Sequence, residues 1–207
     1  MDPATGRVRL TLPTRAALRP ALAWAESKRA WIDAQQARLP QARPFAPGET
    51  IPVGDATLQI VWDAAAGRSP LREGDALRCG GPLERVPARV ERWLRGESLA
   101  VLSAETQRTA ARAAVTVSQV AIGDPRGRWG SCTATGAIRY SWRLILAPSF
   151  VLRATVAHEV AHRLHMDHSP AFHAAVARLL EADPAPARAW LRAHGAALHW
   201  YGRASGS

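Results

Sequence analysis

The chain has 207 residues, enough for one or two small domains, and 47% of them are hydrophobic, which allows a packed core and excludes a disordered chain. The formal net charge of +10 favours an anionic partner such as a nucleotide, a nucleic acid or an acidic peptide. The basic residues are nearly all arginine and are spread along the chain without a long run. The charge alone therefore does not indicate nucleic-acid binding.

The sequence predicts a cytoplasmic protein without a membrane segment. No apolar run approaches the roughly 20 residues that span a bilayer, and the first residues lack the apolar core of a signal peptide. Because nothing indicates secretion, we expect Cys79 and Cys132 to be free thiols. Two cysteines cannot form a four-thiolate zinc site, so any metal must rely on histidine and carboxylate ligands.

The first part of the chain predicts short strands and one helix. The alternation of polar and apolar residues over residues 7–12 predicts a strand, which follows a turn at residues 2–6. Residues 20–38 have the composition of a helix. Two hairpins are predicted, one around Gly54-Asp55 and one around residues 72–75.

The second part predicts helices around a small sheet. Residues 87–114 predict a long helix that is interrupted near Gly96. The predicted strands cover residues 117–122, 128–132 and 137–145. Three further helices are predicted, from Pro148 to about His165, from Pro170 to about Glu181, and over about 187–200. Ser169 followed by Pro170 is the pattern of an N-cap with proline in the first helical position.

These elements predict an α+β protein in two parts. Residues 1–85 form a strand-rich extension, and residues 86–207 form a domain of helices packed around a small antiparallel sheet. The residues with metal-ligand spacing all lie in the second part.

His158, Glu159 and His162 form an HExxH pattern within a mostly small and apolar helix. Residues four apart on a helix are separated by about 40° around the axis and about 6 Å along it, so two imidazoles can converge on one metal ion. Glu159 then reaches a water molecule without being a ligand, and acts as general base. The alternative is a pair of histidines that are hydrogen-bonded in a core helix.

A catalytic zinc needs a third protein ligand, for which His165, His168 and His173 are the candidates. On a straight helix His165 lies about 10.5 Å from His158, which is too far for bonds of about 2.1 Å. The start of a new helix at Ser169 requires a turn that can swing His168 back toward the metal. The spacing therefore favours His168, with one zinc ion per chain.

Three segments resemble the YgjP-like metallohydrolase family, which is related to SprT-like and other small HExxH metallopeptidases. They are RWGSC at residues 128–132, SWRLILAP at residues 141–148 and HEVAHRLHMDHSPAFH at residues 158–173. The resemblance covers about residues 86–182, with a looser match over residues 8–38. Two departures are a missing strand before the first turn and His173 where tryptophan is common.

The resemblance implies a zincin-like core, a small antiparallel sheet laid against the HExxH helix. It implies metal ligands at His158, His162 and His168 and a catalytic glutamate at Glu159. Members of the family are described as metallopeptidases, and a UTP pyrophosphatase activity has also been assigned to it. The substrate is therefore a peptide, a protein or a nucleotide.

Substrate-binding candidates lie on the strands before this helix, namely Arg128, Trp129, Trp142 and Arg143. The tryptophans are candidates for stacking on substrate, and the arginines for an anion-binding rim. The alternatives are core packing for the tryptophans and a solvated sheet edge for the arginines. Three hypotheses follow: a zinc metallopeptidase, a metal-dependent nucleotide pyrophosphatase, and a non-catalytic binding module that contains zinc.

Overall fold

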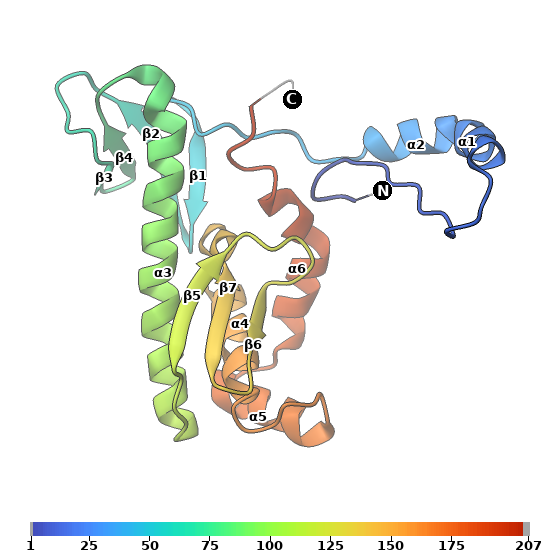
Figure 1. The fold of residues 1–207 in the computed structure, drawn as a ribbon. Helices are drawn as coiled ribbons and strands as arrows, with labels where there is room; N and C mark the ends of the chain where they lie inside the picture. Colours follow the sequence, from blue (N-terminus) through green and yellow to red (C-terminus); the bar gives the residue numbers. More distant parts are fainter. Residues whose placement is uncertain (1, 205–207) are drawn as a thin grey trace.

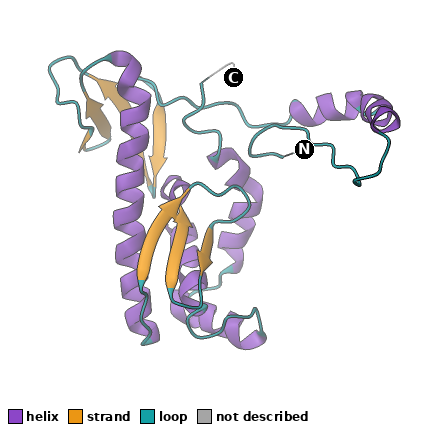
Figure 2. Ribbon diagram, viewed as in Figure 1, coloured by secondary structure: helices purple, strands orange, loops and turns teal. Residues whose placement is uncertain are grey.

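The computed structural model describes residues 2–204, which form an α+β fold with two small sheets (Figure 1, Figure 2). The α-helices are α1 (Leu18–Ser27), α2 (Arg29–Gln36), α3 (Val86–Ala113), α4 (Ser149–Ala161), α5 (Pro170–Leu180) and α6 (Ala185–Leu198), with short 3-10 helices η1 (Leu83–Arg85) and η2 (Trp142–Leu146). The strands are β1 (Thr50–Val53), β2 (Ala56–Trp62), β3 (Leu71–Glu73), β4 (Ala76–Cys79), β5 (Gln119–Gly123), β6 (Gly130–Cys132) and β7 (Ala137–Ser141). Within the described residues, no helix combines the length and the apolar character needed to cross a membrane.

The first sheet has the strand order β1-β2-β4-β3. Both predicted hairpins are confirmed, β1 with β2 and β3 with β4, and each turn holds a glycine with positive φ, Gly54 at 61° and Gly74 at 61°. Glycine suits these positions because it has no Cβ to clash in the left-handed region. Strands β2 and β4 pair in parallel at the centre of the sheet.

The second sheet has the order β5-β7-β6 and is mixed rather than wholly antiparallel, because β5 runs parallel to β7 while β6 runs antiparallel to it. The predicted strand over 137–145 was too long. The chain leaves the sheet at Ser141, whose hydroxyl accepts a hydrogen bond from the Arg143 amide and caps η2. The predicted interruption of the long helix was also wrong, since α3 continues through Gly96. This glycine is exposed, and no atom outside the neighbouring helix backbone lies within 4 Å of the position that a Cβ would take there.

Helix α4 is the centre of the second half. It contacts α3 and α5 and lies against α6 and the edge strand β6 (Figure 1). Nine of its thirteen residues are buried, as the small and apolar sequence predicted. A helix buried on most sides holds its side chains in fixed positions, which suits it to carry a site.

The two sheets share one hydrophobic core, which extends from Phe45 to Tyr201 and includes residues of both halves. Two contacts tie the first hairpin to the second half. The amide of Gly54 donates to the carbonyl of Ile145 at 2.8 Å, and Asp55 accepts from the Ser149 amide at 2.9 Å at the start of α4. The division at residue 85 remains a prediction about independent folding.

The N-terminal segment differs from its prediction. Residues 7–12 form no strand, because no other strand lies beside them to supply hydrogen bonds. The predicted helix over 20–38 is divided at Lys28 into α1 and α2, which extend away from the rest of the chain (Figure 1). Neither helix has a buried residue, and Trp24 and Trp31 are more than half exposed.

Candidate metal centre

Helix α4 presents His158 near its C-terminal end and finishes at Ala161, with His162 as the C-cap residue. The amide of His165 donates to the carbonyl of Ala161 at 3.0 Å, which closes a turn directly after the helix. The Arg163 guanidinium donates to the carbonyls of Thr116 and Ala134 at 3.2 and 2.8 Å. The Arg163 bonds hold the end of α4 against the loops of the second sheet, and the turn at His165 lets the chain change direction.

The reversed chain brings His168 back to the helix. The Ser169 hydroxyl accepts a hydrogen bond from the Phe172 amide at 3.4 Å and caps α5, as the Ser-Pro pattern predicted. His168 immediately precedes this cap, so the start of α5 sets its position. The structure thus groups His168, rather than His165 or His173, with His158 and His162.

The three imidazoles have the separation that one metal ion requires. One ring nitrogen from each of His158, His162 and His168 lies within 4.8 Å of the others, and the Nε2 atoms of His158 and His168 are 3.4 Å apart. A tetrahedral zinc with bonds of about 2.1 Å holds two nitrogens about 3.4 Å apart. His162 Nδ1 lies 3.2 Å from the carbonyl oxygen of His165, so an Nδ1–H can donate there while Nε2 keeps its lone pair for the cluster.

The ring of Phe172 packs against all three imidazoles. Its ring is fully buried, and its centroid lies 4.9 Å from that of His158, 4.6 Å from His162 and 4.8 Å from His168. The imidazoles therefore pack against an apolar ring, and this contact limits their rotation.

Burial keeps the imidazoles of His158 and His162 in the neutral form that binds metals. Burial, with the neighbouring His162 and His168 rings as a smaller cause, lowers the pKa of His158 to about 4. Burial likewise lowers the pKa of His162. At neutral pH a cation therefore has no proton to displace from these two rings.

Glu159 lies beside the cluster and only 5% of it is exposed. Burial raises the pKa of its carboxyl to about 7, and the positive charge of Arg128 opposes this rise. The side chain crosses directly over Gly130 of β6, where an added Cβ would lie 2.4 Å from Oε1. A glycine in the edge strand is thus what allows the carboxylate to occupy this place.

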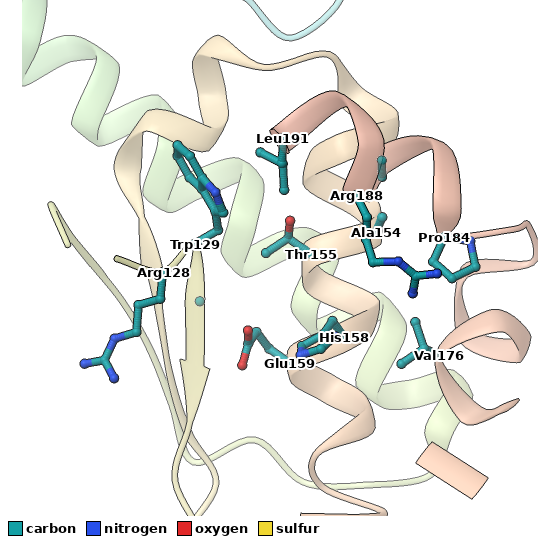
Figure 3. Close-up of a pocket in the computed structure, with 12 residues that line it drawn as sticks. Arg128, Trp129, Ala154, Thr155, His158, Glu159, Val176, Pro184, Arg188 and Leu191 are labelled. Atoms are coloured by element: carbon teal, nitrogen blue, oxygen red, sulfur yellow. The ribbon is translucent and has the colours of Figure 1, made fainter. Parts of the chain in front are cut away.

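A pocket of about 260 Å³ opens beside His158 and Glu159 (Figure 3). Its walls come from β6, α4, the C-terminal half of α5 and the first turns of α6. They consist of Arg128, Trp129, Gly130, Ala154, Thr155, Val176, Pro184, Ala187, Arg188 and Leu191. Most of this lining is apolar, which suits a substrate group with an apolar part.

Of the four predicted substrate-binding residues, Arg128 and Trp129 line the pocket, but Trp142 and Arg143 do not. Trp142 is fully buried, and the guanidinium groups of Arg95 and Arg143 lie 4.8 and 4.6 Å from the centre of its ring. Arg143 itself donates to Asp124 at 2.7 and 3.1 Å, and to the backbone carbonyls of Leu198 and Tyr201 at the end of α6 and just after it. Both are held in the structure by packing and pairing, so we do not retain them as substrate contacts.

The remaining histidines lie outside the cluster. His173 is exposed, with its ring centroid 6.4 Å from that of His168. His194 packs on Trp190 with ring centroids 4.9 Å apart. His199 is buried 5.5 Å from the Trp129 ring and within 4.0 Å of Asp124, in the contact that attaches the end of α6 to the sheet.

Three residues of the site carried no clear signal in the sequence. Gly130 was part of a recognised segment, but its role in admitting Glu159 depends on the crossing of β6 and α4. Phe172 was visible only as an aromatic residue after the helix start. Arg188 has the same local context as Arg192 one turn later, and only the packing of α6 distinguishes them.

A family model described as YgjP-like, metallopeptidase domain, matches residues 2–194. The match includes both the first sheet and the whole of the candidate metal centre. No curated protein and no solved structure matches the chain.

Proposed function

The chain belongs to the YgjP-like metallopeptidase family, and from that premise we propose that it is a zinc-dependent hydrolase that cleaves peptide bonds. The observation that carries the proposal is the 3.4 Å separation of His158 and His168 Nε2, with the buried carboxylate of Glu159 beside them. Nitrogen ligands at this separation fit zinc, and the metallopeptidase family implies a metal.

In this proposal His158, His162 and His168 hold the ion. Zinc bound there would supply a Lewis acid that activates water and polarises the scissile carbonyl. Glu159 accepts the proton of the attacking water and returns it to the leaving amine. A carboxyl group with a pKa near 7 is suited to both steps, because it gains and loses a proton with little cost at neutral pH.

The pocket orients the substrate. Trp129 and Leu191 provide apolar surface on the pocket wall, and Gly130 leaves room for the Glu159 side chain at the edge of β6. Hydrolysis of a nucleoside triphosphate remains the second candidate, because two arginines, Arg128 and Arg188, are among the residues that line the pocket, and guanidinium groups pair with phosphate.

The test combines metal content with hydrolysis. Purified wild type is expected to hold about one zinc ion per chain by mass spectrometry, and His168→Ala is expected to lose it. His173→Ala is the matched control and should keep the metal, because its ring lies outside the cluster. Glu159→Gln should also keep the metal but lose hydrolysis of a fluorogenic peptide library, with UTP assayed in parallel.

Each of three results would contradict the proposal. A wild-type protein that takes up no zinc on titration cannot work by this chemistry. Full hydrolysis by Glu159→Gln would remove the general base from the mechanism, and cleavage of UTP alone would assign the site to nucleotides.

A further inference from the structure

Arg188 is a charged group in an otherwise largely apolar part of the pocket. It extends from the first turns of α6, and its neighbours on that wall are Ala187 and Leu191. In Figure 3 its guanidinium lies beside Pro184 and above Val176, whereas Arg128 extends away from the pocket. The two pocket arginines thus occupy different places relative to the metal centre.

Arg188 forms no ion pair or side-chain hydrogen bond with another described residue. The nearest acidic residues in sequence are already engaged, since Glu181 pairs with Arg112 and Asp183 accepts from the Ala185 amide. Among the described residues that line the pocket, only Glu159, on the β6 side, carries a carboxylate. The guanidinium therefore adds uncompensated positive charge to the pocket.

Arg188 and His158 line the same pocket of about 260 Å³. An anion bound at Arg188 would lie close enough to the cluster to belong to the same substrate molecule. A guanidinium is suited to this because its planar donors pair with carboxylate or phosphate oxygens in a two-pronged contact.

We propose that Arg188 forms an anion subsite of the active site, which binds a carboxylate or phosphate group of a substrate whose apolar part fills the pocket. The pocket of about 260 Å³ has room for one apolar side chain or a comparable group next to that anion. For a peptide substrate the anion is a terminal or side-chain carboxylate. The inference rests on the proposed function, because it assumes that substrate is held at the same time by the zinc centre.

The test uses zinc-loaded protein and three probes that anchor on the metal through a hydroxamate. In each probe a succinyl unit joins the hydroxamate to leucine, which ends in a carboxylate, in a neutral amide, or in a phosphonate that replaces the carboxylate. Dissociation constants are measured by calorimetry for wild type, Arg188→Met, Arg188→Lys and Arg192→Met. Arg192 is the matched control, since it is an exposed arginine on the same helix that does not line the pocket.

Wild type and Arg192→Met should bind the carboxylate probe about tenfold more tightly than the amide, which corresponds to about 1.4 kcal/mol. Arg188→Met should bind the two equally, and Arg188→Lys should fall between, because lysine keeps the charge but not the planar donors. Tighter binding of the phosphonate than of the carboxylate would assign the subsite to phosphate, and the reverse would assign it to a peptide carboxylate.

Equal binding of carboxylate and amide to wild type would overturn this inference while leaving the proposed function intact. A carboxylate preference that survives in Arg188→Met would likewise overturn it. Failure of all three probes to bind, in a protein that retains no zinc, would overturn the proposed function and this inference with it.

Discussion

Gly130→Ala tests whether the edge strand sets the position of the general base. The added Cβ would lie 2.4 Å from Oε1 of Glu159 and 2.6 Å from its Cγ and Cδ. Carbon atoms in contact are normally about 3.5 Å apart, so the glutamate must move by about 1 Å or the strand must shift. A displacement of about 1 Å in a catalytic group costs about 100-fold in rate.

We therefore expect Gly130→Ala to lower kcat on peptide substrates by about 100-fold while zinc content stays unchanged, because Glu159 is not a ligand in the proposed site. Gly96→Ala is the control. No atom outside the neighbouring helix backbone lies within 4 Å of the Cβ that this substitution adds. The alanine should therefore stabilise α3 by about 0.5–1 kcal/mol and leave the activity unchanged.

Steady-state kinetics and metal analysis on the same preparations of both variants test whether β6 sets the position of Glu159. Activity of Gly130→Ala within about twofold of wild type would show that Glu159 is not held by the strand, and the reasoning would fail. Loss of zinc together with activity would instead show that the substitution disturbs α4 as a whole.

Three further predictions concern stability and metal affinity. Arg143→Gln should lower the free energy of unfolding by about 1.5–3 kcal/mol in urea titrations, because it removes the largely buried guanidinium that pairs with Asp124 and donates to the carbonyls of Leu198 and Tyr201; a change below about 0.5 kcal/mol would contradict this. Hydrogen bonds from the Ser149 hydroxyl and amide hold the pKa of Asp55 below its ordinary value, so the stabilising contact is present above about pH 4 and is lost as pH falls through the lower folded pKa. The stability difference between wild type and Asp55→Asn should accordingly shrink on acidification, and a difference that stays constant with pH would refute it. Phe172→Leu should weaken zinc binding about tenfold in chelator competition, because the smaller side chain packs less closely against the three imidazoles and restrains their rotation less. An unchanged zinc affinity would show that contact with the Phe172 ring does not position the imidazoles.

Local sequence patterns predicted the structure correctly where a few neighbouring residues determine the backbone conformation. Gly54-Asp55 gave a hairpin because only glycine adopts the required φ freely, and Ser169-Pro170 gave the start of α5. The long helix was predicted, but its interruption at Gly96 was not observed, because neighbouring packing along α3 outweighs the weak helix propensity of one exposed glycine.

Strand predictions failed where they depended on a partner. Residues 7–12 alternate as a strand does, but the described fold places no strand beside them. Residues 142–145 continue the alternation of β7, yet Ser141 caps a 3-10 helix there. Period-two patterns report which side chains are buried, while hydrogen-bonded neighbours decide whether a strand forms.

The sequence by itself determined the α+β class and the family, and it singled out His158, Glu159, His162 and His168, because helical spacing and a short turn are local properties. Only the tertiary structure decided which groups surround them. Gly130 lies directly against the Glu159 side chain, and Arg188 rather than Arg192 lines the pocket, because β6 and α6 both pack against α4. Such contacts join residues that are far apart in the chain, and no local pattern encodes them.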